Sequence, residues 1–201
     1  MRAVLRFAAS VMMVSGALLI AEAVTTLLWQ EPLSALLAKR SQDRLEKALA
    51  KPPRRVLIRQ PLPGDALGRI LIPHIHLSKF IVEGTDHSDL RRGPGHYPRT
   101  ALPGQRGTVA IAGHRTTYGA PFRHIDKLHR GDKVILDMIY GRFVYSVQGT
   151  RIVQPTAFWV TARKPYNRLV LSACHPLFSA AKRIVVFGRF VRRGPTRVRR
   201  T

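Results

Sequence analysis

The sequence predicts an all-β protein with short helices, preceded by one membrane-spanning helix. The chain of 201 residues contains 15 Gly and 14 Pro, which favour many turns between short strands over long helices. Its short apolar runs are separated by turn-forming residues, a pattern typical of a β-barrel or a β-sandwich. A separate and much longer apolar stretch lies near the N-terminus.

This N-terminal stretch covers residues 7–29 and contains Glu22 as its only charged residue. At about 1.5 Å per helical residue, it can cross a bilayer core of about 30 Å. Arg2 and Arg6 precede it. We therefore expect a single membrane anchor. A cleaved signal peptide is the alternative, because residues 21–23 resemble a small-x-small cleavage site.

Residues 33–50 follow, in which leucines and alanines recur with charges between them, predicting an amphipathic helix. Its apolar face could pack on the membrane, on the folded domain or on another copy of the chain. Repeated prolines in residues 51–64 predict an extended linker that acts as a spacer. The expected parts are a membrane anchor, a helix with a Pro-rich basic linker, a β-domain and a basic tail, at residues 1–30, 31–65, 66–191 and 192–201.

The strands of the β-domain are predicted from short apolar runs bounded by turn residues. Tyr140 and Gly141 fit a hairpin turn, and residues 88–92 fit a single helical turn. The expected strands cover residues 67–72, 77–82, 108–112, 133–138, 142–153, 169–173 and 184–191.

The charge balance is strongly basic, with 34 Lys and Arg against 11 Asp and Glu, a formal net charge of +23. Such a charge suits an anionic membrane or cell-envelope polymer as well as DNA. The sequence shows no phosphate-binding loop, helix-turn-helix pattern or RNA-binding strand pattern, so we expect no nucleic-acid partner.

The spacing of potential metal ligands in this sequence gives only weak evidence for a metal site. His74 and His76 stand two residues apart and could face the same side of one strand as two ligands. With no carboxylate or thiol beside them in the sequence, we expect exposed surface histidines instead. We therefore predict neither a metal site nor a cofactor.

The single cysteine, Cys174, ends the apolar run of residues 169–173. A cysteine in this place is either an inert buried side chain or a nucleophile. His114 also follows a predicted strand end, and Arg183 opens the last strand. A thiol, an imidazole and a guanidinium are the three parts of cysteine acyl transfer.

Three other residues compete for these roles. His175 adjoins the cysteine, but consecutive strand residues point to opposite faces, so it is a poorer proton shuttle than His114. Arg115 directly follows His114, and Arg189 lies well along the final strand. Arg183 is therefore preferred.

The order of these motifs resembles that of sortases. The motifs are Gly-Pro-Gly-His-Tyr-Pro at residues 93–98, His-Arg-Thr-Thr-Tyr-Gly-Ala-Pro-Phe at 114–122 and Leu-Ser-Ala-Cys-His-Pro at 171–176, with Arg183 opening the next strand. The second and third are most similar to class E sortases. The resemblance covers residues 67–191 and implies a closed sortase-type β-barrel.

The resemblance also implies roles for individual residues. Cys174 would be the nucleophile, His114 the general acid and base, and Arg183 the stabiliser of the oxyanion or the substrate carbonyl. Three neighbours are expected to contact substrate: Tyr118, Ala173 and His175. The family pattern Thr-Leu-x-Thr-Cys is altered here, because Val170 and Ala173 replace the two threonines.

The activity implied by the resemblance is cleavage of a Thr-Gly bond in a C-terminal sorting signal of the Leu-Ala-x-Thr-Gly type. The partners would be exported proteins that carry this signal and an amine of a peptidoglycan precursor in a Gram-positive envelope. The N-terminus would be cytoplasmic and the catalytic domain outside the membrane. Two alternatives stay open: a membrane-tethered basic module that binds an anionic polymer, and a hydrolytic cysteine peptidase.

Overall fold

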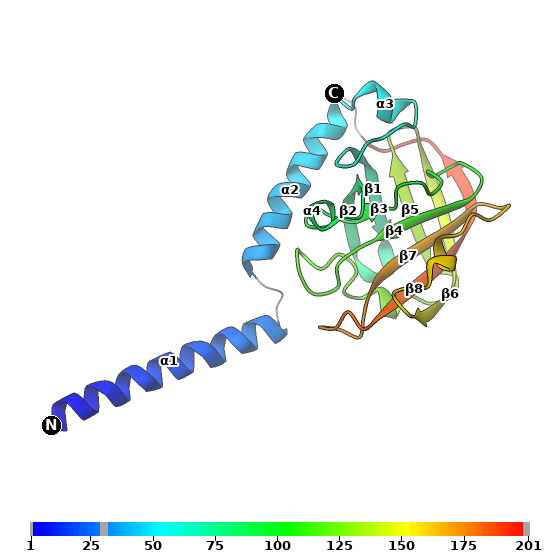
Figure 1. The fold of residues 1–201 in the computed structure, drawn as a ribbon. Coiled ribbons are helices and arrows are strands. Elements are labelled where there is room, and N and C mark those ends of the chain that lie inside the picture. The colour runs from blue at the N-terminus through cyan, green and yellow to red at the C-terminus, as the bar shows by residue number, and fades with distance from the viewer. Residues whose placement is uncertain (1, 29–31, 199–201) are drawn as a thin grey trace.

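The strands close into a barrel in the computed structural model, which describes residues 2–28 and 32–198 (Figure 1). Around the barrel, the strands follow the order β1-β2-β3-β4-β7-β8-β6-β5. Neighbours are antiparallel except in the pairs β2–β3 and β4–β7, which are parallel. The bounds are β1 Ala66–Ile72, β2 Leu77–Glu83, β3 Gly95–His96, β4 Thr108–Ala112, β5 Lys133–Met138, β6 Gly141–Val153, β7 Arg168–His175 and β8 Lys182–Gly194.

The expected all-β class and the closed barrel are confirmed. The bounds of β4 and β5 agree with the prediction, and the other five expected strands differ from it by up to three residues at an end. The hairpin between β5 and β6 is also present, with Met138 paired to Gly141. Strand β3 was missed because its two residues are too few to show a periodic pattern.

The alternation of side chains along β7 separates the inside of the barrel from the outside. Leu169, Leu171 and Ala173 belong to the large core cluster that strands around the whole barrel share. Val170 lies between them and belongs to a second, smaller cluster. Since successive strand residues point to opposite faces, the even-numbered residues of β7, which include Cys174, point outward.

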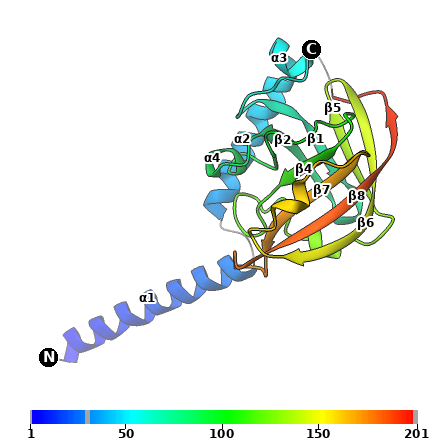
Figure 2. The same ribbon diagram turned by 45° about the vertical axis from the view of Figure 1, so that its right-hand side comes forward.

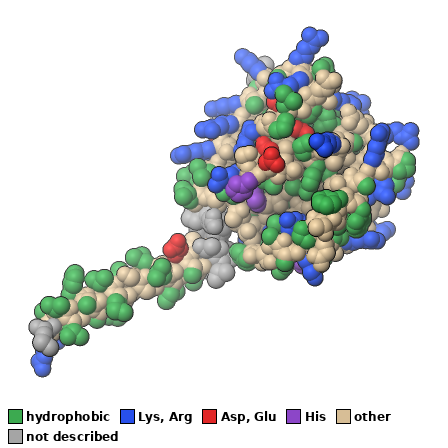
Figure 3. Space-filling view, in the orientation of Figure 1, with side chains coloured by type: hydrophobic (Ala, Val, Ile, Leu, Met, Phe, Trp, Pro, Cys, Tyr) green, Lys and Arg blue, Asp and Glu red, His purple; other side chains and the backbone are tan. Residues whose placement is uncertain are grey.

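Helix α1 (Arg2–Leu28) extends away from the barrel (Figures 1 and 2). It is long and apolar enough to cross a membrane, and none of its membrane-length window is buried in the protein. Hydrophobic side chains cover most of α1, whereas Lys and Arg are spread over the visible face of the barrel (Figure 3). The apolar surface of α1 is typical of a membrane anchor, whereas the charged surface of the barrel is typical of a solvated domain.

Helix α2 (Pro32–Ala50) packs against the barrel beside β1 and β2. Its Leu45 and Leu49 are fully buried and join the main core cluster. The Gln42 side chain adds polar contacts, accepting from the Phe80 N–H at 2.7 Å and donating to the Arg92 carbonyl at 2.8 Å. The apolar face of this helix therefore packs on the folded barrel, one of the three surfaces considered for it.

The segment expected to be an extended spacer is folded against the barrel instead. Residues Arg54–Leu57 form the one-turn helix α3, directly after Pro53, where proline is compatible with a helix start. Val56 is only 2% exposed and joins the core, and Arg55 forms an ion pair with Asp65 at 2.7 Å. Prolines before the first turn do not prevent a helix, and the buried valine holds this one in place.

The basic tail expected from residue 192 begins later in the structure. Strand β8 continues to Gly194, where it pairs with Arg142 of β6. Beyond the strand, the Thr196 hydroxyl and the Arg197 N–H both donate to Asp137 Oδ1, at 3.2 and 2.9 Å. The predicted boundary of the tail at residue 192 is therefore too early, because strand pairing and this carboxylate hold residues 192–197. Residues 199–201 lie outside the described residues.

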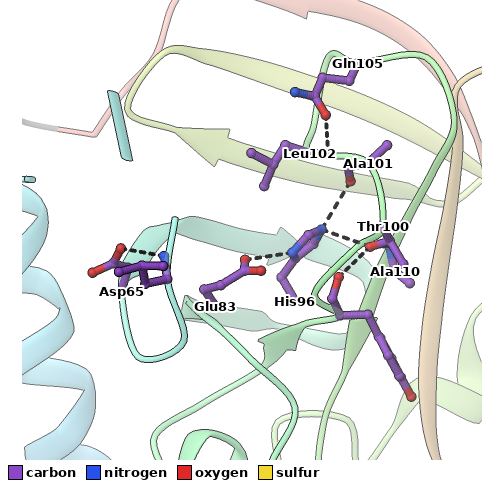
Figure 4. A network of polar contacts seen from close by, with 10 residues as sticks. Asp65, Glu83, His96, Thr100, Ala101, Leu102, Gln105 and Ala110 are labelled. Carbon is purple, nitrogen blue, oxygen red and sulfur yellow. Dashed lines mark hydrogen bonds and ion pairs between the residues drawn. The ribbon is translucent and has the colours of Figure 1, made fainter. Parts of the chain in front are cut away.

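A buried polar network joins β2 to β3 (Figure 4). Glu83 Oε2 lies 2.8 Å from His96 Nδ1, and both side chains are almost fully buried. The other ring nitrogen of His96 lies 3.1 Å from the Ala101 carbonyl. Buried polar groups paired on both sides in this way fix the register of the short strand β3. The remaining short elements are α4 His87–Leu90, η1 Pro73–Ile75, η2 Ile125–Lys127 and η3 Phe158–Thr161.

Candidate active site

The parallel pairing of β4 and β7 brings His114 and Cys174 to the same rim of the barrel. The last residue pair of these strands is Ala112 with Ser172, and the Gly113 N–H donates to the Ser172 carbonyl at 3.0 Å. His114 and Cys174 each lie two residues beyond that last pair. Two residues 60 positions apart in the sequence therefore lie at the same end of two adjacent strands.

Arg183 lies directly opposite Cys174 in the antiparallel pair β7–β8. Side chains that are directly opposite share a face, with Cβ atoms about 4.5–5.5 Å apart. The Arg183 Nη1 donates to the carbonyls of Ala180 and Lys182, at 2.9 and 3.0 Å, so the loop between the strands holds this guanidinium. The strand register thus places Cys174 and Arg183 opposite each other on the outer face of the barrel.

Cys174 is half-buried and lines a cavity of about 280 Å³. A free thiol in contact with such a cavity is open to a substrate, unlike a cysteine packed in the core. The other lining residues are Arg115, Thr116, Thr117, Pro176, Phe178, Ser179 and Ala180. Among the described residues, those of the loop after β4 and the β7–β8 loop thus form the walls around the sulfur.

Arg115, the alternative to Arg183, is only 3% exposed and is held by other groups. It forms an ion pair with Asp126 at 2.9 Å and donates to the Arg123 carbonyl at 3.2 Å. Its Nη1 lies 3.5 Å from the main-chain carbonyl of Cys174, so it contacts the backbone of the nucleophile's strand. Arg115 therefore holds the end of β7 and also lines the cavity beside Cys174.

His114 is partly buried, and its Nε2 has no hydrogen-bond partner among the described residues. Its ring lies 5.2 Å from the Tyr118 ring and 6.5 Å from the His87 ring, measured between centroids. Burial of the imidazole lowers the pKa of His114 below its usual value, and the like charge of His87 lowers it further. Near neutral pH the ring is therefore neutral and can accept a proton.

The lowered pKa of His114 makes the stability of the fold depend on pH. Below about pH 6.5 this histidine in the unfolded chain binds a proton more readily than in the folded chain, so acidification destabilises the fold. Replacing His87 with glutamine should raise the pKa of His114, because the like charge is removed while the burial remains. NMR titration of the His114 ring protons measures this shift. An unchanged or lower value in the variant would contradict this account of the site.

Tyr118 lies beside His114, with ring centroids 5.2 Å apart. Its hydroxyl accepts a hydrogen bond from Arg91 Nε at 2.7 Å, and its N–H donates to the Ser34 hydroxyl of α2 at 3.2 Å. Tyr118 has a left-handed backbone, with φ of 50°. The helix before the barrel therefore supports the loop that carries His114.

The other two residues expected to contact substrate lie elsewhere. Ala173 is 3% exposed and belongs to the barrel core, on the face opposite Cys174. The replacement of threonine at this position therefore changes the core more than the cavity. By the alternation of side chains along β7, His175 lies on the same face as Ala173, at the end of the strand. Its Nδ1 lies 3.4 Å from Arg115 Nη1.

Two contacts of the site were not expected from the sequence. His87 of α4, in the connection between β2 and β3, lies beside His114. His74 also gained a partner, because Asp132 Oδ1 lies 3.0 Å from its Nδ1. The sequence carried no signal for either contact, because both join segments that only the closed barrel brings together.

Known proteins similar to this chain are sortases. The sortase domain family model matches residues 70–191. Sortase D of Bacillus subtilis is 35% identical over 136 residues, which cover 66% of this chain and 67% of that protein. Sortase SrtE1 of Streptomyces coelicolor is 31% identical over 66% of this chain and 42% of its own length, so the chain spans less than half of that relative.

A solved structure of sortase E1 from Streptomyces coelicolor, with a tripeptide in its active site, is also similar. It superimposes with a TM-score of 0.63 at 29% identity, covering 66% of this chain and 91% of that one. The family model, the relatives and this solved structure all identify the same family. The chain belongs to the sortase family of cysteine transpeptidases.

Proposed function

We propose that this protein is a membrane-anchored sortase that cleaves the Thr-Gly bond of a Leu-Ala-x-Thr-Gly sorting signal. It joins the new acyl group to an amine of a cell-wall precursor and so attaches exported proteins to the envelope. The observation that carries this proposal is the open thiol of Cys174, which lies on a cavity directly opposite Arg183. A tripeptide in the active site of the related Streptomyces coelicolor enzyme supports a peptide substrate.

In the proposed mechanism, Cys174 Sγ attacks the carbonyl carbon of the substrate threonine while His114 takes the thiol proton. Arg183 stabilises the negative charge on the carbonyl oxygen of the tetrahedral intermediate. The C–N bond then breaks, and His114 gives the proton to the departing glycine amine, leaving a thioester. An incoming amine passes its proton to His114 as it attacks the thioester, and Cys174 regains a proton when the sulfur leaves.

The neutral state of His114 fits the first step of this mechanism. Because burial keeps its pKa low, the imidazole at neutral pH has a free site for the thiol proton. The same burial makes the imidazolium a stronger acid once it forms, which favours transfer of the proton to the leaving amine. One residue can therefore act as the base and then as the acid.

The proposed division of the chain places the anchor at residues 1–30 and the catalytic barrel at 66–191. Helix α1 supports a single membrane span by its length and apolar composition. The proposed orientation has the N-terminus in the cytoplasm and the barrel outside, where exported proteins and cell-wall precursors are found. The segment between them is the folded support of α2 and α3 described above.

A peptide assay with and without an amine tests the proposed function. The full chain in detergent is incubated with a Leu-Ala-x-Thr-Gly peptide, and the products are identified by mass spectrometry. A sortase should yield the amide of the threonine with an added amine such as triglycine. Free acid as the product in the presence of amine would identify a hydrolytic peptidase instead. Absence of cleavage, together with an unreactive thiol, would favour the anionic-polymer binding module.

Replacement of Arg183 by alanine should lower turnover by about 100-fold or more, because an oxyanion donor is lost. The matched control is Arg189→Ala, which removes the same side chain from the same face of β8, further along the strand. The peptide assay gives kcat and KM for both variants. Wild-type kcat in the Arg183 variant, or an equal loss in both, would exclude the role assigned to Arg183.

A further inference from the structure

Three potential metal ligands from two separate connections meet at the catalytic rim of the barrel. His74 belongs to η1, between β1 and β2, whereas His129 and Asp132 lie in the turn that precedes β5. One ligand atom from each residue lies within 4.8 Å of the others. The shortest separation is 3.0 Å, between His74 Nδ1 and Asp132 Oδ1. The two imidazole rings have centroids 5.5 Å apart.

The carboxylate of this cluster is held in place by its own turn. Asp132 Oδ2 accepts a hydrogen bond from the His129 N–H at 2.8 Å, which leaves Oδ1 directed at His74. The Gly131 N–H donates to the Val147 carbonyl at 2.9 Å, tying the turn to β6. A carboxylate oriented by a second hydrogen bond is the usual support of a metal ligand. The side chains of His74 and Asp132 are 44% and 18% exposed, so an ion can reach them from solvent.

We propose that His74, His129 and Asp132 form a binding site for a divalent transition-metal ion of the Zn²⁺ type. Two imidazoles and one carboxylate are ligands that Zn²⁺ prefers, and a water molecule completes four-coordination. Ligand atoms around a tetrahedral Zn²⁺ ion are about 3.3 Å apart, given Zn–N and Zn–O bonds of about 2.0–2.1 Å. The hydrogen bond between His74 and Asp132, at 3.0 Å, is close to this spacing, and a metal ion would take the place of its proton. The ligand atom of the exposed His129 lies within 4.8 Å of both.

The composition of the cluster also decides which ions it should reject. Calcium requires about six to eight oxygen ligands, and magnesium also prefers oxygen, whereas this cluster offers one carboxylate. The basic surroundings, with Arg130 in the same turn, oppose cations held by charge alone. Imidazole nitrogens bind through their lone pairs, so Zn²⁺, Co²⁺ and Ni²⁺ are favoured over Ca²⁺ and Mg²⁺.

The position of the cluster relates it to the proposed catalytic function. The segment that carries His129 also carries Asp126, the ion-pair partner of Arg115, which in turn contacts the Cys174 carbonyl. An ion bound to His74 and His129 would join the β1–β2 connection to this segment and reduce its freedom. The site would therefore stabilise the support of Arg115 from outside the substrate cavity.

Metal binding is measured on the full chain in detergent, without a polyhistidine tag. Cys174→Ala is used as the background because the catalytic thiol could itself bind Zn²⁺. Co²⁺ is titrated while its visible absorption is recorded, and Zn²⁺ affinity is obtained by competition. We expect one ion per chain, displaced by Zn²⁺ and unaffected by excess Ca²⁺.

The variants His74→Ala, His129→Ala and Asp132→Asn should each weaken Zn²⁺ binding by at least about tenfold. The matched control is His76→Asn, two residues from His74, where asparagine tolerates the left-handed backbone with φ of 51°. Circular dichroism confirms that each variant folds. No Zn²⁺ uptake by the background chain, or equal affinity in all four variants, would overturn the proposal. These experiments measure metal binding alone, so a negative result would not affect the proposed transpeptidase activity. A negative result in the peptide assay would likewise not affect the proposed metal site.

Discussion

Replacement of Cys174 by alanine is expected to lower peptide cleavage by at least about 10⁴-fold, because the covalent pathway disappears with its nucleophile. No other thiol in the chain can replace it, since Cys174 is the only cysteine. The loss should appear in kcat, with the peptide still bound, because the walls of the cavity come from other side chains. Single-turnover mass spectrometry should show a thioester in the wild-type chain and none in the variant.

A change of folding must be separated from this loss of chemistry. Cys174 is half-buried on the outer face of the barrel, so alanine leaves the main core intact. Equal melting temperatures and equal peptide binding in the two chains would show that only the reaction was removed. Residual cleavage within about tenfold of wild type would rule out covalent catalysis by this cysteine.

Replacement of His114 by glutamine is expected to lower turnover by about 10²- to 10⁴-fold, the usual contribution of a general acid and base. Both half-reactions should slow, because the same imidazole protonates the leaving amine and deprotonates the incoming one. Rapid-quench measurement of thioester formation, followed by addition of triglycine, measures the two steps separately. Labelling of Cys174 by an alkylating probe should also become slower, since the base that accepts the thiol proton is lost.

His175→Gln is the matched control for this variant. His175 is next to the nucleophile in sequence, but its side chain belongs to the opposite face of β7 and contacts Arg115. A change of no more than a few-fold is expected there. If His175→Gln abolishes turnover and His114→Gln does not, the assignment of the acid and base must be reversed.

The strands could be predicted well because their signal is local. Strands β4 and β5 were bounded correctly, since each is a short apolar run between turn residues. Strand β3 has two residues and no pattern, and its place depends on a parallel pair with β2 and an antiparallel pair with β4. Helix α3 was mistaken for extended chain, because the burial of Val56 that holds it depends on the barrel surface.

The candidate site was only partly predictable for the same reason. Cys174, His114 and Arg183 were identified because each stands at a strand end, which can be seen in the sequence. The arrangement of Arg115 around the Cys174 carbonyl, 59 positions away, could not be seen. Neither could the pair of His74 and Asp132, which are 58 positions apart and meet at the connections beside β1 and β5.

The sequence alone determined the candidate reactive groups of this protein, which are Cys174, His114 and Arg183 near predicted strand ends, and the apolar segment before them. These follow from residue identity and from periodicity over a few residues. The tertiary structure decided which side each group faces and what surrounds it. It placed Cys174 on the outer face and Ala173 in the core, and it put His87 beside His114. Such relations depend on barrel closure and strand register, which bring together segments that no local pattern connects.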